Sequence, residues 1–234
     1  MILSIILPAN GDVNRAIDKI GQAVLKYNKN MSQITSIEQQ QKDKTRCSVY
    51  IDGRFYCGLK IEVAIKYRLK AGMTIEKSML DEIQLESEKV QATEKAMNHL
   101  SATLKTKKQM RDFLSSKGYT PAVVDYVIGK LEGYGYIDDY AYCRAYVNSV
   151  KGKGKLALRT ALIGKGADRQ AIDEVLEESE ESEDEVFALA QKYMRGKSAT
   201  RENFAKTLRY LLSRGYGYDI AKEAVSKLGG QDED

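Results

Sequence analysis

Three segments of the chain repeat one pattern around a glycine. They read MRDFLSSKGYTPAVVDYVIGKL, LRTALIGKGADRQAIDEVLEES and TLRYLLSRGYGYDIAKEAVSKL, and the aligned glycines are Gly118, Gly166 and Gly215. A lysine or arginine stands immediately before each glycine, and a leucine stands four residues before it. Self-similarity at a period of roughly fifty residues is typical of proteins built from tandem structural units.

Each repeated segment predicts the end of one helix and the start of another. A basic residue and then a glycine after an apolar helical stripe indicate a helix C-terminus, because the helix dipole favours the cation and glycine readily adopts a positive φ. Pro121 stands where the next helix of the first repeat would begin. Further helices at about 88–104, 139–151 and 184–195 complete three short helices per repeat. Since none can bury its apolar face alone, we expect an elongated, curved helical array.

The part of the chain before the repeats has the character of β-strands. The segments ITSIEQ, RCSVYI and RFYCGL are rich in β-branched and aromatic residues, and Asp52-Gly53 between the last two is a strong hairpin signal. We predict a sheet of two or three strands, then a short helix in IEVAIKYRLKAG that ends at Gly72, and no later strand. A two-residue turn would place Cys47 and Cys57 on opposite faces of the sheet, where they stay reduced.

The predicted fold is mainly α, with tandem three-helix repeats after a small N-terminal hairpin or sheet and a short helix. We expect an N-terminal extension at 1–30, a strand-containing region with a linking helix at 31–87, three-helix repeats at 88–138, 139–183 and 184–230, and an acidic tail at 231–234. Strand-forming sequence begins after Met31. We therefore interpret residues 1–30 as an N-terminus assigned too far upstream rather than as part of the fold.

Composition excludes several classes of function. An apolar fraction of 43% suits a folded domain, while no apolar run approaches the length of a membrane span and the N-terminus lacks the features of a secretory signal. We therefore expect a cytoplasmic protein. The three cysteines have no metal-ligand spacing, and the single histidine, His99, has no second ligand nearby. We predict no metal and no cofactor.

Two adjacent carboxylates, Asp138 and Asp139, could be a pair of catalytic acids or the start of a helix. The apolar stripe of Tyr142, Tyr146 and Val150 begins directly after them. Asp138 suits the N-cap, and Asp139 in the first turn would interact favourably with the helix dipole. Catalysis would need a third carboxylate, a histidine or a phosphate-binding glycine loop nearby, and the local sequence has none. We expect helix capping, no catalytic residue and no enzymatic activity.

Charge is segregated into blocks. From Ala141 to Arg169 the only acid is Asp168, whereas DEVLEESEESEDE at 173–185 contains no base, and the third repeat is basic again. The glycine-rich KGKGKLALR at 151–159 does not match a nucleotide-binding loop and is interpreted as a flexible, charged link between helices. Because the acidic block would repel phosphate, this order favours a protein partner, or one already wrapped on DNA, over nucleic acid alone. The central tyrosines are expected to pack between helices rather than stack on bases.

The sequence resembles the RecX family of bacterial proteins that regulate the RecA recombinase. The resemblance extends from about Ile34 to the C-terminus. It is carried by ITSIEQQQKDKTRCSVYIDGRFYCGL, EVAIKYRLKAG, LSSKGY, VVDYVIGKLEGYGYIDD, YAYCRAYV and GKGKLALRTALIGKGA. The Gly-Tyr-Ile-Asp-Asp-x-x-Tyr core, followed by a lysine-glycine helix end, is its most specific part. One position departs from the family pattern, because Ala161 stands before Leu162 where a glutamate is common.

The resemblance implies a crescent-shaped protein of three-helix repeats that binds in the groove of the RecA filament on single-stranded DNA. Such a protein would limit filament activity in homologous recombination, DNA repair and the SOS response without catalysing a reaction. The basic residues expected to contact the partner are Arg111, Lys117, Arg144, Lys151, Lys153, Lys155, Arg159 and Lys165. The alternative is a helical-repeat protein that binds single-stranded nucleic acid directly and needs no protein partner.

Overall fold

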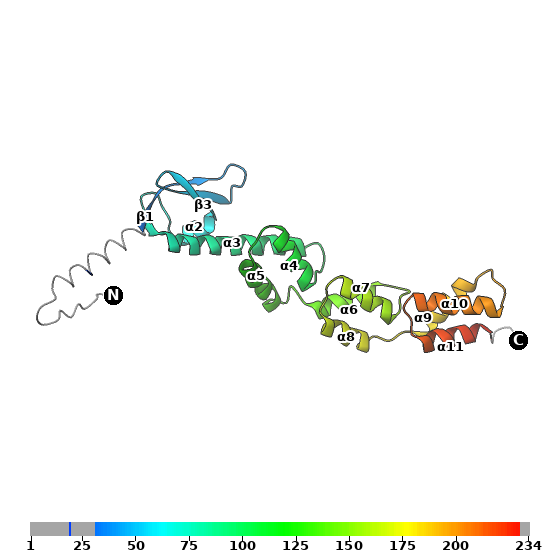
Figure 1. Ribbon diagram of the computed structural model, residues 1–234. Helices are drawn as coiled ribbons and strands as arrows, with labels where there is room; N and C mark the ends of the chain where they lie inside the picture. Colours follow the sequence, from blue (N-terminus) through cyan, green and yellow to red (C-terminus); the bar gives the residue numbers. More distant parts are fainter. Residues whose placement is uncertain (1–18, 20–30, 230–234) are drawn as a thin grey trace, which may run out of the picture. The chain divides into compact units, whose positions relative to one another are not determined.

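The structure is a computed structural model that describes Lys19 and residues 31–229. Apart from Lys19, the expected extension at 1–30 and the expected tail at 231–234 lie outside the described residues. The chain divides into two compact units, and the boundary falls between Glu94 and Lys95 (Figure 1). We call them the N-terminal unit and the helical unit.

The N-terminal unit is built on an antiparallel sheet with the strand order β3-β2-β1-β4. Its strands are β1 Met31–Gln39, β2 Arg46–Ile51, β3 Arg54–Lys60 and β4 Thr74–Glu76. The predicted N-terminal sheet is thus confirmed. The expectation of no strand after β3 is wrong, because a strand of three residues is too short to show an alternating pattern.

The hairpin between β2 and β3 forms at the predicted turn. Asp52 and Gly53 have φ values of 50° and 75°, the left-handed conformations that a tight hairpin turn requires. A bulge at Tyr56 in β3 then shifts the register, so that Cys57 lies opposite Val49. Cys47 and Cys57 consequently face the same buried core, and their predicted placement on opposite faces is wrong. Both are free thiols.

The short helix α2, Ile61–Lys66, ends before the predicted Gly72. Arg68 follows in the left-handed region with a φ of 50°, which is incompatible with a continuing helix. Gly72, with a φ of 83°, instead forms a turn and donates its amide to the Ile34 carbonyl at 2.8 Å. The chain is thereby returned to the sheet as β4.

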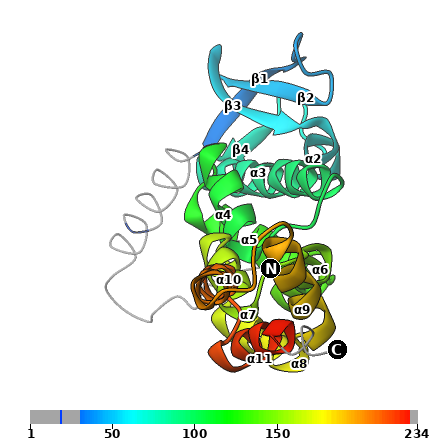
Figure 2. The same cartoon turned by 90° about the vertical axis from the view of Figure 1, so that its right-hand side faces the viewer.

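Both α2 and the start of α3, Lys77–Leu100, pack on one face of the sheet (Figure 2). The largest fully buried side chains of this core are Ile34, Val49 and Leu59 from the sheet, with Leu80 and Ile83 from α3. The helix expected at about 88 begins instead at Lys77, because the apolar stripe of α3 continues onto the sheet.

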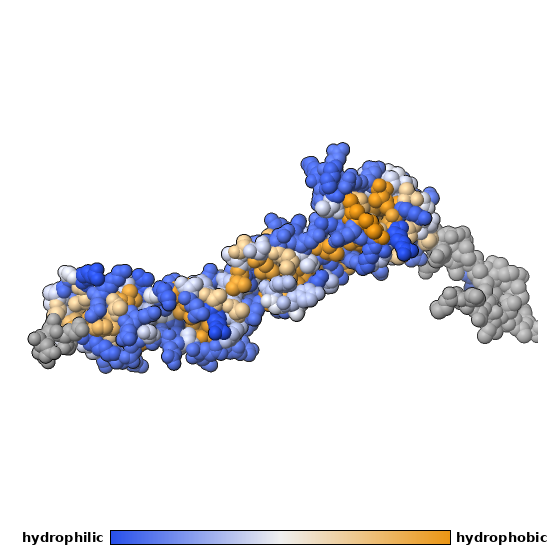
Figure 3. Space-filling model, turned by 180° about the vertical axis from the view of Figure 1, so that it is seen from behind, coloured by the Kyte–Doolittle hydropathy of each residue, from blue (hydrophilic) through white to orange (hydrophobic). Residues whose placement is uncertain are grey.

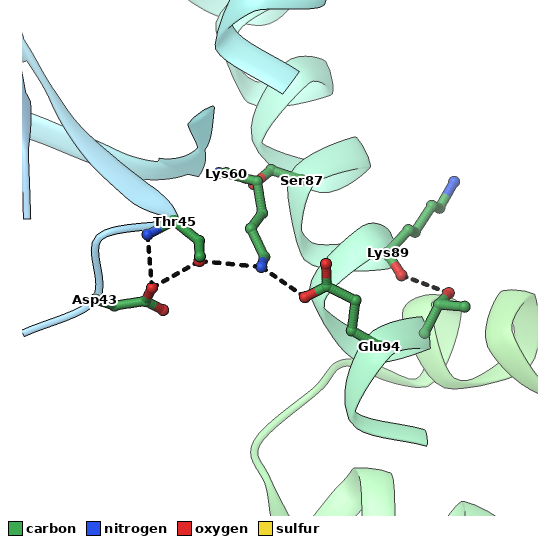
Figure 4. A network of polar contacts seen from close by, with 7 residues as sticks. Asp43, Thr45, Lys60, Ser87, Lys89 and Glu94 are labelled. Carbon is green, nitrogen blue, oxygen red and sulfur yellow. Dashed lines mark hydrogen bonds and ion pairs between the residues drawn. The ribbon is translucent and has the colours of Figure 1, made fainter. Parts of the chain in front are cut away.

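A polar network fixes α3 to the end of β3 (Figure 4). Lys60 is only 7% exposed, and its amide donates to Ser87 Oγ at 2.7 Å. Its Nζ lies 2.5 Å from Glu94 Oε2 and donates to Thr45 Oγ1 at 3.2 Å, while Thr45 donates its hydroxyl and amide to Asp43. The buried ammonium is therefore satisfied by groups from the β1–β2 loop and from α3.

The helical unit contains the predicted three-helix repeats. The first repeat comprises the end of α3, α4 Lys107–Ser116 and α5 Pro121–Gly133. The second comprises α6 Asp139–Ser149, α7 Lys155–Gly164 and α8 Arg169–Glu178. The third comprises α9 Glu183–Met194, α10 Arg201–Ser213 and α11 Tyr218–Gly229. Among the described residues, no helix is both long and apolar enough to cross a membrane.

The aligned glycines stand where the repeat pattern predicts. Gly118, Gly166 and Gly215 have φ values of 84°, 73° and 87°, and the basic residue before each is the C-cap of α4, α7 or α10. Pro121 is the first residue of α5. The second repeat buries its core around Cys143 and Leu162, and much of the helical unit's surface is hydrophilic (Figure 3).

Candidate partner-binding surface

The two carboxylates of the central motif both bind backbone amides. Asp138 is the N-cap of α6, as predicted, and its Oδ1 accepts from the Ala141 amide at 3.0 Å. Asp139 lies in the first turn of α6, where its Oδ1 accepts from the Lys107 amide at 2.8 Å and its Oδ2 from the Asp168 amide at 2.8 Å. One carboxylate therefore joins the starts of α4, α6 and α8.

We call this contact between the first and second repeats the first joint. Thr106 caps α4 by accepting from the Gln109 amide, and its hydroxyl donates to the Lys165 carbonyl at 3.0 Å. A Cβ on Gly166 would lie 2.4 Å from the Lys108 Cδ, so the repeats approach closely at this glycine. The sequence predicted a helix start here but not the contacts with helices distant in sequence.

The second joint, between the second and third repeats, is built from backbone contacts around glycines. The Gly154 amide donates to the Arg214 carbonyl at 2.9 Å, and the Leu156 amide donates to the Gly215 carbonyl at 3.1 Å. A Cβ on Gly154 would lie 2.3 Å from the Gly215 oxygen. Gly154 is buried at this joint, a role that the interpretation of 151–159 as a flexible link did not include.

Basic and acidic residues face each other across a cavity of about 470 Å³ at the second joint. Lys151, Lys153 and Lys155 line it together with Glu181 and Glu185. Glu181 accepts from the Lys155 amide at 2.7 Å, and Lys151 Nζ lies 3.9 Å from Glu185 Oε1. The structure thus brings three of the predicted contact lysines together. They line the same cavity as carboxylates of this chain.

Two of the other predicted contact residues form ion pairs. Arg111 donates to Asp125 Oδ1 at 2.6 Å, and Arg159 donates to Asp173 Oδ1. Asp173 belongs to the acidic block, as does Glu185 beside Lys151. The acidic block therefore neutralises part of the basic stretch that precedes it, an internal pairing that the order of charges along the sequence cannot reveal.

The acidic block also contacts other parts of the helical unit. Tyr140 donates its hydroxyl to Glu178 at 2.5 Å, which raises the pKa of the tyrosine. Lys227 Nζ lies 2.8 Å from Glu183, and this hydrogen bond lowers the pKa of the Glu183 carboxyl. These contacts connect the block to α6 and α11.

The remaining predicted cations are Lys117, Lys165, Arg144 and Lys153. Lys117 and Lys165 hold Nζ 5.4 Å and 5.1 Å from the ring centroids of Phe113 and Tyr146. Arg144 and Lys153 are exposed, and neither forms an ion pair with another residue that the structure describes. The eight predicted contact residues are therefore distributed over α4, α6, α7 and both joints.

The central aromatic residues divide into a packed group and an exposed group. Tyr140, Tyr142 and Tyr146 pack against the core of the second repeat, as expected, whereas Tyr134 and Tyr136 are exposed. His99 also packs against an aromatic side chain. It stacks on the Phe113 ring with centroids 3.9 Å apart, and burial lowers its pKa.

Comparisons with known proteins cover both units. The family model described as regulatory protein RecX N-terminal domain matches residues 32–76, and those described as the first and third three-helix domains of RecX match 92–131 and 180–225. Regulatory protein RecX of Clostridium botulinum is 30% identical over 204 residues, which are 84% of this chain and 96% of the relative. Its counterpart in Listeria innocua is 32% identical over 211 residues, 86% of this chain and 78% of the relative.

Solved structures give the same result for the fold. A crystal structure of regulatory protein RecX aligns with a TM-score of 0.64 at 24% identity, over 81% of this chain and 96% of the other. The crystal structure of RecX from Lactobacillus salivarius aligns with a TM-score of 0.58 at 25% identity, over 60% of this chain and 96% of the other.

Proposed function

Because the chain belongs to the RecX family of regulatory proteins, we propose that it binds the filament of the RecA recombinase on single-stranded DNA and lowers its activity in recombination and DNA repair. The observation that supports this most is the extent of the relationship, 84% of the chain, which includes the sheet and the repeats. Tandem repeats offer a long surface that suits a filament. The protein would act in the cytoplasm, by binding rather than catalysis.

The structure suggests an order of importance among the eight proposed contact residues. Arg144 and Lys153 are exposed and without an ion pair among the described residues, so they can meet an acidic partner without breaking an existing contact. To bind an acidic partner, Arg111 and Arg159 would each have to leave the carboxylate of this chain and pair with a carboxylate of the partner. Their ion pairs are largely exposed, and such pairs contribute only about 0–1 kcal/mol, so this exchange costs little.

The proposal is tested by adding the protein to RecA assembled on single-stranded DNA and following ATP hydrolysis and strand exchange. We expect both to fall to a plateau as the protein is added. A saturable increase in ATP hydrolysis and strand exchange would mean that the protein binds the RecA filament but stimulates it. No effect at saturating concentration would refute the proposal.

Charge reversal locates the contact. The double variant Arg144→Glu, Lys153→Glu should need a higher concentration for the same effect, because both cations would become repulsive toward an acidic partner. Lys222→Glu is the matched control for each of the two single reversals, since Lys222 is also exposed but lies on α11 and outside the proposed set. An equal loss in the control and in the single reversals would show that only overall charge matters.

A further inference from the structure

The third repeat contains a stacked pair of tyrosines that holds two cations. Tyr193 of α9 and Tyr210 of α10 have ring centroids 4.3 Å apart and an interplanar angle of 14°. Lys197 Nζ lies 3.3 Å from the Tyr193 centroid, and Arg214 Cζ lies 5.2 Å from the Tyr210 centroid. Rings 4.3 Å apart leave no room for an ammonium group, so Lys197 occupies the outer face of Tyr193.

A cavity of about 440 Å³ opens beside the stacked rings. It is lined by both tyrosines and by Lys206, Arg209 and Ser213 of α10. Arg209 is exposed, and its Nε donates to the Ala205 carbonyl at 3.4 Å, which leaves its terminal amino groups available. The cavity is therefore bordered by two cationic side chains and two tyrosines.

Positive charge in this region is hardly compensated. Between Lys192 and Arg214 the sequence has seven lysines and arginines and one acid, Glu202, which pairs with Lys206 at 2.7 Å. Among the described residues, no ion pair is made by Lys197, Arg209 or Arg214. The second repeat differs, because its cations are partly neutralised by the acidic block.

Contact with an aromatic ring keeps a cation available to an anion. The ring attracts the positive charge through its quadrupole and accepts no conventional hydrogen bond, so the donors of Lys197 and Arg214 remain free for an incoming oxygen. A carboxylate partner would instead occupy these donors and cancel the charge. The tyrosine pair thus orders two cations without neutralising them.

We propose that this third-repeat patch, formed by Tyr193, Lys197, Lys206, Arg209, Tyr210 and Arg214, binds the phosphate backbone of single-stranded nucleic acid directly. Interfaces with nucleic acid are much more positively charged than those with proteins, whose cores are depleted in lysine, and the patch has the former composition. The outer face of Tyr193 and the faces between the rings are occupied, so the patch contacts phosphates rather than stacking on bases. It therefore binds without sequence preference. This proposal does not depend on the recombinase.

The test is binding of a fluorescently labelled oligothymidylate to the full chain, without recombinase, followed by anisotropy over a series of salt concentrations. We expect affinity to fall steeply with salt, because phosphate contacts release counterions. In the double variant Lys197→Ala, Arg209→Ala, affinity should fall severalfold and the logarithmic salt slope should decrease by about 2, or about 1 for each cation removed.

Two further variants separate a local contact from a change in charge or folding. Lys222→Ala removes one exposed cation of the same repeat outside the cavity and should bind like the wild type. Arg209→Lys keeps the charge and should retain most of the affinity. Unchanged binding by the double variant would overturn the proposal, as would a larger loss from Lys153→Ala in the second repeat. Polyglutamate that competes as well as unlabelled oligonucleotide would overturn it in favour of an acidic protein partner.

Discussion

At the first joint the opening amide of α4, from Lys107, is bound by the carboxylate of Asp139, and at the second joint the opening amide of α7, from Lys155, is bound by the carboxylate of Glu181. Asp139 lies in the first turn of the following repeat, whereas Glu181 lies in the connection between α8 and α9. The second oxygen of Asp139 also binds the amide of Asp168, whereas the second joint adds two backbone hydrogen bonds to the end of α10. A shared arrangement of helices is thus held by different chemistry.

The two joints also differ in how closely the backbones approach. A Cβ on Gly166 at the first joint would meet the flexible side chain of Lys108, but a Cβ on Gly215 at the second would lie 2.3 Å from the Ala157 amide nitrogen. A side chain can move aside, and a helical backbone cannot without shifting the helix. The second joint therefore depends on its glycines more strictly, and the first joint depends more on one charge.

The largest effect is expected from Gly215→Ala. The substitution should lower the free energy of unfolding by about 4 kcal/mol, of which about 1 kcal/mol comes from the positive φ and about 3 kcal/mol from overlap with α7. Gly118→Ala is the matched control, because Gly118 has a φ of 84° and nothing within 4 Å of its Cβ position. Gly118→Ala should lower the free energy of unfolding only by the contribution of the positive φ, about 1 kcal/mol. Urea denaturation followed by circular dichroism measures both, and equal losses would contradict the close approach at the second joint.

Asp139→Ala should cost about 3 kcal/mol, because it removes a charged acceptor from two backbone amides. Asp138→Ala removes an ordinary N-cap and should cost about 1 kcal/mol, and Glu181→Ala, which frees one amide, should fall between the two. The same urea titration ranks the three variants. If Glu181→Ala cost as much as Asp139→Ala, the two joints would depend equally on charge.

Local features of the fold were predictable because they depend on neighbouring residues. The hairpin at Asp52-Gly53, the start of α5 at Pro121 and the three positive-φ glycines each follow from one residue's conformational preference. The bulge in β3, the strand β4 and the early end of α2 depend on pairing with distant segments. No short sequence pattern contains that information, so the faces of the cysteines and the end of the helix were predicted wrongly.

Less of the candidate site could be predicted than of the fold. The sequence correctly indicated that Asp138 caps a helix, and it identified a set of basic residues whose role in binding stays a prediction. It could not show that Arg159 pairs with Asp173 or that Tyr193 stacks on Tyr210, because each pair joins two different helices. Whether a cation is available to a partner is decided by such tertiary contacts.

The pH dependence of stability should distinguish the joints through Cys143. This thiol is fully buried on α6, and burial, with a smaller effect of Asp139, raises its pKa from 9.0 to about 11. The neutral thiol is favoured in the folded state, so its contribution is complete below pH 9 and is lost as the pH rises from 9 to 11. The loss should reach roughly 2 kcal/mol and be missing in Cys143→Ala.

Comparing unfolding free energies at pH 8 and pH 10.5 in each background makes this a probe of the first joint. Asp139→Ala should reduce the pH-dependent component, because a negative charge that raises the pKa of Cys143 is removed. Glu181→Ala should leave it unchanged. A component that is the same in all three backgrounds would show that burial alone sets the pKa of this thiol.

The smallest effect is expected from Lys151→Ala at the second joint. Its Nζ lies 3.9 Å from Glu185, and the two side chains are 78% and 62% exposed, so water and salt screen the pair. We expect a loss below about 0.5 kcal/mol, indistinguishable from Lys153→Ala, which removes a cation of the same cavity without breaking an ion pair. A loss above about 1 kcal/mol that disappears at high salt would show that charge stabilises this joint as well. A small, salt-independent loss would mean that the backbone contacts at Gly154 and Gly215 hold the second and third repeats together.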